Sequence, residues 1–187
     1  MASDSPYRIV GIAGSLRRGS FNRALLRTAQ ELALERLNIQ IHEIGDVPLY
    51  NQDIEDQTVP QAVDSLRQAV READGLLIAT PEYNHGVPGV LKNAIDWLSR
   101  PPRGSALNGK PAALMGASPG MTGTARCQSQ LRQSFVFTNT PAMLQPEVLV
   151  SRAHEKFDAN GRLTDEPTRK FLGQFLDHFA AWIPRFR

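Results

Sequence analysis

A loop near the N-terminus carries side chains that are suited to hold an anion. The sequence GSLRRGSFN at 14–22 follows a short apolar run and precedes a helical pattern. Where a strand leads into a helix, free backbone N–H groups and the positive end of the helix dipole form a phosphate site. Ser15, Ser20 and Asn22 add neutral donors, and Arg17 adds a charged one. The pattern predicts a phosphate-binding loop; the alternative is an ordinary strand-to-helix turn with serine caps.

The spacing of the glycines limits which phosphate-containing ligands this loop is suited to bind. Gly14 and Gly19 match the glycines of a nucleotide-hydrolysing P-loop, but Ser20 stands where that motif requires lysine. That lysine contacts the terminal phosphates, so ATP and GTP chemistry is disfavoured. Gly11 and Gly14 do not have the G-x-G-x-x-G spacing of a dinucleotide fold. The simplest remaining ligand is a monophosphate with a ring system, such as FMN.

Two further loops also follow apolar runs. The sequence TPEYNHGVPG at 80–89 has two prolines and two glycines, which fix an unusual backbone. Exposed amides in such a loop suit the polar edge of a flavin ring, although composition alone fits a tight turn capped by Asn84 equally well. The sequence GASPGMTGT at 116–124 is rich in small residues, which let a ligand approach the backbone closely.

The elements that must position these loops alternate along the chain. Apolar runs predict strands at 8–13, 39–44, 75–79, 111–116 and, interrupted by Pro146, at 143–150. Helical spacing predicts helices at 21–37, 60–73, 87–98, 122–137 and 167–183. This alternation predicts an α/β fold: a five-stranded parallel sheet with helices on both faces, flavodoxin-like rather than a six-stranded dinucleotide fold. The three loops would then meet at the carboxyl ends of the strands.

The bulk composition limits the class of protein. A chain of 187 residues fits a single domain over 1–187. With 21 basic and 19 acidic residues in scattered positions, a nucleic-acid partner is disfavoured. The single cysteine and four dispersed histidines predict neither disulfides nor a metal site. No signal peptide or membrane-spanning run is visible, so we expect a cytoplasmic protein without membrane insertion.

We expect several other residues to have structural roles and no part in chemistry. Cys127 is expected to be a buried, inert thiol. The stripe of Phe171, Phe175, Phe179 and Trp182 predicts core packing of the last helix. The segment 153–165 is predicted to be a polar hairpin loop that turns at 160–161.

Four motifs together resemble the NADPH-dependent FMN reductase family, in particular its bacterial chromate reductase and quinone reductase branch. They are GSLRRGSFN at 14–22, PEYN at 81–84 with VPG at 87–89, LKNAIDWLSR at 91–100, and ARCQ at 125–128. Three residues depart from the pattern of the family: His85, Gly86 and Thr124. The first two could alter acceptor choice or assembly contacts.

The resemblance implies a non-covalent FMN site and a homodimer or homotetramer. The residues implied for the phosphate are Ser15, Arg17, Ser20, Phe21 and Asn22. The residues implied for the isoalloxazine are Pro81, Glu82, Tyr83 and Asn84, with Ser118 from the third loop.

The function that follows is an FMN-dependent NAD(P)H oxidoreductase acting on small-molecule electron acceptors by a ping-pong mechanism. Quinones are the leading acceptors, and chromate, free flavin and azo compounds are further candidates. The flavin carries the redox chemistry, so no catalytic protein residue is predicted. One alternative is a non-enzymatic electron carrier of the flavodoxin kind; such carriers are typically acidic, whereas this sequence has a pI of ≈ 8.9. A nucleotide-binding domain without flavin is the other alternative.

Overall fold

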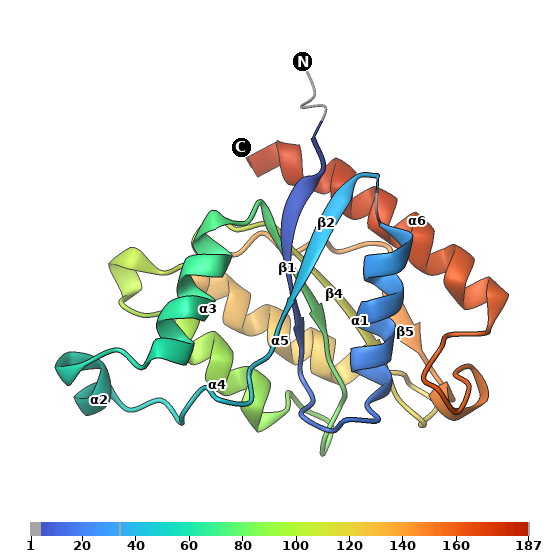
Figure 1. Cartoon of the computed structure of the whole chain (residues 1–187), viewed down its shortest axis with the longest axis horizontal. Coiled ribbons are helices and arrows are strands. Elements are labelled where there is room, and N and C mark those ends of the chain that lie inside the picture. The colour runs from blue at the N-terminus through green and yellow to red at the C-terminus, as the bar shows by residue number, and fades with distance from the viewer. Residues whose placement is uncertain (1–4, 34, 187) are drawn as a thin grey trace.

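A parallel β-sheet forms the centre of the computed structural model, which describes residues 5–33 and 35–186 (Figure 1). Its strands are β1 (Tyr7–Ala13), β2 (Leu37–His42), β3 (Gly75–Ala79), β4 (Ala112–Ala117) and β5 (Val148–Val150). Their order is β2-β1-β3-β4-β5, and every neighbouring pair is parallel. The predicted five-stranded parallel sheet is confirmed.

Helices cover both faces of this sheet (Figure 1). The helices on one face are α1 (Phe21–Leu32) and α6 (Glu166–Trp182), and those on the other are α3 (Gln61–Glu72), α4 (Gly89–Leu98) and α5 (Ala125–Thr138). A short helix α2 (Gln52–Gln57) and the 3-10 turns Pro102–Gly104, Ala153–Glu155 and Ile183–Phe186 complete the elements. One apolar cluster lies on each face of the sheet, so its strands are buried on both sides.

The central strands are continuous apolar runs because neither of their faces meets water. All of β3 is buried, from Gly75 to Ala79. Alternate side chains of β3 belong to opposite clusters: Leu77 packs beneath α1 and α6, and Ile78 packs against α4 and α5. The alternation of strands and helices along the sequence therefore folds into three layers, with the sheet between two layers of helices.

Several boundaries differ from the sequence-based expectation. The first helix ends at Leu32 instead of continuing to 37, because Leu37 pairs with Tyr7 as the first residue of β2. The fourth helix begins at Ala125 rather than 122, since Gly123 has a positive φ of 61°. The fifth strand is limited to Val148–Val150, and Ala142 contributes only an isolated bridge to Ala112.

Two predictions based on apolar pattern were incomplete. Helix α2 lies between the predicted strand at 39–44 and the predicted helix at 60–73, where the sequence indicated no element; none of its residues is buried, so it shows no apolar periodicity. In α6, Phe175 and Phe179 are buried as predicted, but Phe171 is 39 % exposed.

The predicted hairpin loop after β5 is confirmed by an antiparallel bridge between Phe157 and Leu163.

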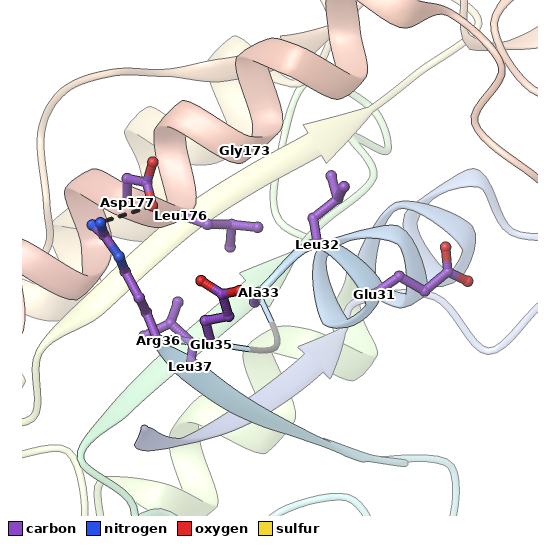
Figure 2. Close-up of a pocket in the computed structure, with 9 residues that line it drawn as sticks. All are labelled: Glu31, Leu32, Ala33, Glu35, Arg36, Leu37, Gly173, Leu176 and Asp177. Carbon is purple, nitrogen blue, oxygen red and sulfur yellow. Dashed lines mark ion pairs between the residues drawn. The ribbon is translucent and has the colours of Figure 1, made fainter. Parts of the chain in front are cut away.

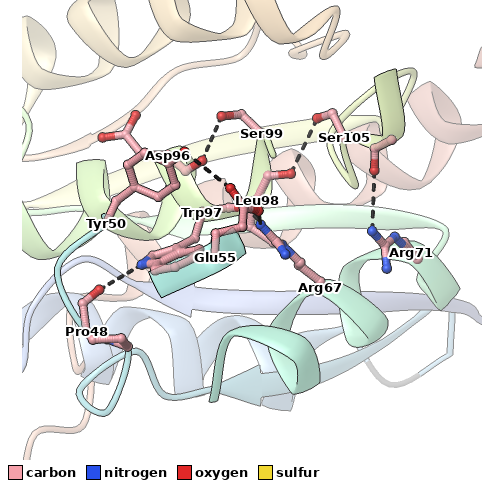
Figure 3. A network of polar contacts seen from close by, with 11 residues as sticks. Pro48, Tyr50, Glu55, Arg67, Arg71, Asp96, Trp97, Leu98, Ser99 and Ser105 are labelled. Atoms are coloured by element: carbon pink, nitrogen blue, oxygen red, sulfur yellow. Dashed lines mark hydrogen bonds and ion pairs between the residues drawn. The ribbon is translucent and has the colours of Figure 1, made fainter. Parts of the chain in front are cut away.

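The segment between β2 and α3 is fastened to α4 by a polar network (Figure 3). The guanidinium of Arg67 is buried; it pairs with Glu55, donates to the Trp97 carbonyl at 3.0 Å and lies over the Trp97 ring. The Trp97 indole N–H donates to the carbonyl of Pro48 at 2.7 Å. Asn93 also bonds this segment, with its amide N–H on the Pro48 carbonyl at 2.8 Å. The LKNAIDWLSR motif thus anchors a long connection.

Candidate functional site

The three loops singled out in the sequence enclose one cavity of about 350 Å³. It lies where the carboxyl ends of β1, β3 and β4 meet, the position at which ligands bind in open α/β sheets. Nine of the ten predicted site residues line it: Ser15, Arg17, Ser20, Phe21, Asn22, Pro81, Glu82, Tyr83 and Ser118. Ala117 and Pro119 of the predicted third loop also line it; they were not named as site residues because their side chains carry no polar group.

The first loop ends in a capped helix. Ser20 is the N-cap of α1, and its Oγ accepts the N–H groups of Asn22 at 3.2 Å and Arg23 at 3.4 Å. The Ser20 hydroxyl hydrogen stays available to a ligand, because an accepting oxygen still has its own O–H to donate. Arg17 lines the cavity, and no ion pair of its guanidinium appears in the described part of the chain.

Asn22 joins the first loop to the third. Its amide Nδ2 donates to the carbonyl of Ala117, and its Oδ1 accepts the N–H of Ala117, both at 2.8 Å. The side chain is almost fully buried in this pair of bonds. Asn22 therefore holds the two loops at a fixed separation, and its direct contact with a ligand stays a prediction.

The second loop contains a tight turn. Tyr83 and Gly86 exchange backbone hydrogen bonds of 3.2 and 2.9 Å, with Asn84 and His85 between them at φ values of 50° and 62°. Two positive φ values in a two-residue connection are the geometry of a type I′ hairpin turn. Asn84 does not line the cavity, so the structure does not bring it together with the other predicted residues. The Tyr83 hydroxyl lies 3.5 Å from Ser15 Oγ and thus connects the second loop to the first.

Glu82 caps a helix that begins more than forty residues later. Its Oε2 accepts the N–H of Arg126 at 3.0 Å and of Cys127 at 3.1 Å, in the first turn of α5. The N-cap residue of that helix, Thr124, makes no capping bond of its own. Because the carboxylate and the capped amides are far apart in sequence, no local motif signalled this role. The contact ties the second loop to the positive end of the α5 dipole.

The third loop fits closely because a side chain is missing at Gly116. A Cβ added there would lie 1.9 Å from Thr124 Oγ1. Thr124 is fully buried, and its hydroxyl accepts a hydrogen bond from the Gln128 amide at 3.0 Å. The residue that departs from the family pattern is therefore accommodated by the glycine opposite it.

Cys127 behaves as predicted. Its thiol is fully buried beside the hydroxyl of Thr80, with 3.3 Å between Sγ and Oγ1. Burial raises the pKa of the Cys127 thiol to about 11. The thiol is therefore protonated at neutral pH and poorly nucleophilic.

Another cavity, of about 300 Å³, lies where α1 ends, β2 begins and α6 passes (Figure 2). Arg36 and Asp177 pair on its wall at 3.4 Å. It lies at the amino end of β2, away from the edge of the sheet where ligands collect. None of the predicted site residues lines it.

The described residues show neither a candidate metal centre nor a candidate membrane span. Among residues 5–33 and 35–186, no group of three or more His, Cys, Asp or Glu side chains could hold a metal ion. None of the helices in the described part of the chain has the length and apolar character that a membrane span needs.

The strand order and the cavity define a flavodoxin-like protein with a ligand site built from three loops. The donors at the start of α1 and the rigid second loop are the chemistry that a phosphorylated ring compound requires. The residues present therefore fit FMN.

Similarity to known proteins, in sequence and in structure, supports the assignment to this class. The sequence profile of the NADPH-dependent FMN reductase family matches residues 7–155. An NAD(P)H-dependent FMN reductase of Pseudomonas aeruginosa is 47 % identical over 180 residues, covering 96 % of this chain and 97 % of that protein. A quinone reductase of Pseudomonas putida is 45 % identical over 177 residues, covering 95 % of each chain. The solved structure of FerB, a flavoenzyme NAD(P)H:(acceptor) oxidoreductase from Paracoccus denitrificans, superposes with a TM-score of 0.89 at 39 % identity and covers 96 % of this chain and 98 % of that one.

The chain belongs to the NADPH-dependent FMN reductase family. It is an oxidoreductase with FMN as cofactor and NAD(P)H as electron donor, as the resemblance implied. These relatives favour the enzyme over the electron-carrier alternative.

Proposed function

We propose that this protein uses FMN to transfer electrons from NAD(P)H to quinones. The observation that carries the proposal is that nine residues predicted to hold FMN line one cavity at the carboxyl ends of the strands. The names of the similar proteins support quinones as the acceptor class. Chromate, free flavin and azo compounds are proposed as further acceptors from the family resemblance alone.

The first loop would hold the FMN phosphate. Ser15 and Ser20 would donate hydroxyl hydrogens, and the guanidinium of Arg17 would donate charged N–H groups. The positive end of α1 adds a favourable field for a dianion. The bonds between Asn22 and Ala117 would keep the third loop, with Ser118, at the distance the ring requires.

The second loop would hold the ring system through Pro81, Glu82, Tyr83 and the neighbouring Asn84. Bound FMN supplies the hydride chemistry. The protein residues bind and orient, and no acid or base of this chain is assigned to the reaction. Because the donor and the acceptor would use the same space on the exposed face of the flavin ring in turn, we expect substituted-enzyme (ping-pong) kinetics.

The test combines a binding measurement with a kinetic one. The purified protein, reconstituted with FMN, should show flavin absorbance at a ratio of one FMN per chain and oxidise NAD(P)H when a benzoquinone is present. Double-reciprocal plots at several quinone concentrations should be parallel. Protein that binds no FMN overturns the proposal. Protein that binds FMN but oxidises neither NADH nor NADPH supports the electron carrier instead.

We further infer that residues 1–187 fold as one domain, that the chain assembles as a homodimer or homotetramer, and that it is cytoplasmic. Adjacent apolar side chains on the surface support assembly: Val136 and Phe137, near the end of α5, are 84 and 76 % exposed. The mass in solution, measured by light scattering, tests the assembly. A monomer at micromolar concentration would contradict it.

A further inference from the structure

The second loop is fastened to α5 at both of its ends. At the first end, Glu82 accepts the N–H groups of Arg126 and Cys127. At the other end, the N–H of Val87 donates to Gln130 Oε1 at 2.7 Å. Between these two points the backbone bonds of Tyr83 with Gly86 make the turn a compact unit. Contacts at both ends of the turn restrict its motion more than a contact at one end would.

The contact at Gln130 depends on a glycine. A Cβ added to Gly86 would lie 2.8 Å from Gln130 Oε1, closer than two such atoms approach. Gly86 has no positive φ, so the space it leaves, and not its backbone conformation, is what the structure uses. Gln130 and Gly86 are therefore a matched pair, and a side chain at 86 would push the amide away from the Val87 N–H.

We propose that Gln130 is a positioning residue that holds the second loop in its FMN-binding position through the Val87 amide, a contact that Gly86 permits. Gln130 does not line the cavity, so it acts through the loop, of which Pro81, Glu82 and Tyr83 line the cavity. This inference rests on the proposed FMN site. When part of the population holds the loop elsewhere, the apparent affinity falls in proportion to the competent fraction.

Two single variants and their combination test the pair. Gln130→Ala removes the acceptor, and Gly86→Ala displaces it. Each should raise the Kd of FMN about fivefold, the change expected from one neutral hydrogen bond. The double variant should bind like either single variant, because both changes remove the same contact. Gln130→Glu keeps an oxygen acceptor and should bind FMN like the unaltered protein.

Gln133→Ala is the matched control, since Gln133 is an exposed glutamine on the same helix whose side chain makes no hydrogen bond within residues 5–33 and 35–186. FMN affinity is measured by quenching of flavin fluorescence, and hydrogen exchange of the Val87 amide in FMN-free protein gives a second readout. Faster exchange at Val87 in Gln130→Ala, with weaker FMN binding, supports the inference.

Three results would overturn it: unchanged FMN affinity in Gln130→Ala, additive losses in the double variant, or an equal loss in Gln133→Ala. Failure of the unaltered protein to bind FMN is a different result. It would remove the proposed function, and the exchange of the Val87 amide would then show whether the contact itself exists.

Discussion

Arg17 is the basic side chain among the described residues that line the cavity, so it is the charged donor that the first loop offers to a ligand there. We expect Arg17→Ala to weaken FMN binding by about 10-fold to 100-fold, because a hydrogen bond to a charged group contributes about 1.5–3 kcal/mol. Fluorescence titration at fixed ionic strength measures the change. The neighbouring Arg18, which does not line the cavity, supplies the control Arg18→Ala. Equal losses in the two variants would mean that the effect is general electrostatics and not a phosphate contact.

Also at the scale of single residues, the carboxyl of Asp165 should make the stability of the protein depend on pH. It caps α6, and hydrogen bonds from the Thr168 hydroxyl and N–H lower the pKa of the Asp165 carboxyl below its ordinary 3.8. A carboxyl whose pKa is lowered by folding stabilises the protein above its unfolded pKa and loses that effect as the pH falls through the folded value.

Asp165→Ala should therefore cost about 1 kcal/mol at pH 7, the usual value of such a cap, and less near pH 3. Urea unfolding at the two pH values measures the free energy of unfolding of both proteins. A difference between them that stays constant from pH 7 to pH 3 would contradict the charged cap.

At the scale of elements, the connection from β2 to α3 is held in part by an ion pair with a buried arginine. The side chains of Arg67 and Glu55 are 5 and 15 % exposed, and Glu55 also accepts the Tyr50 hydroxyl at 3.2 Å. Removing Glu55 leaves the charge of Arg67 buried without its counter-ion, and breaking a buried pair in this way costs about 3–5 kcal/mol.

Glu55→Ala should therefore destabilise the protein by about 3 kcal/mol, measured as the free energy of unfolding in urea. Asp96→Ala is the control, because its pair with Lys92 is exposed and such pairs contribute below about 1 kcal/mol. If the two variants lose the same stability, the network of Figure 3 does not hold the segment in the way its contacts indicate.

At the scale of the whole molecule, FMN should act as a stabilising ligand. Its contacts would join the first, second and third loops, which come from the ends of β1, β3 and β4. At a free concentration of about 100 times the Kd, binding adds about 2.7 kcal/mol of stability, so the Tm should rise by about 5–10 °C.

Riboflavin, which lacks the phosphate, is the matched comparison for that thermal shift. It should raise the Tm less than FMN at equal concentration, because the first loop would have no anion to bind. Differential scanning calorimetry measures both shifts. Equal shifts with the two compounds would contradict a phosphate site in the first loop.

Much of the fold could be predicted because its signals are local. Buried parallel strands appear as apolar runs, as in 75–79, and the covering helices appear as periodic patterns. Helix α2 escaped prediction because none of its residues is buried, so a pattern of burial had nothing to detect. Phe171 was misassigned for the opposite reason: the spacing places it on an apolar stripe, but the stripe extends past the core that it covers.

The sequence by itself determined which loops carry donors, which glycine spacings exclude other phosphates, and that the loops share one edge of a parallel sheet. Only the tertiary structure decided how those loops are held. Asn22 bonds Ala117 across 95 positions, Glu82 caps α5 across 44, and Val87 meets Gln130 across 43. Contacts of this kind depend on which segments folding brings together, and no property of either segment alone specifies the partner. The identity of the chemical groups is therefore local information, and their positions are a property of the folded chain.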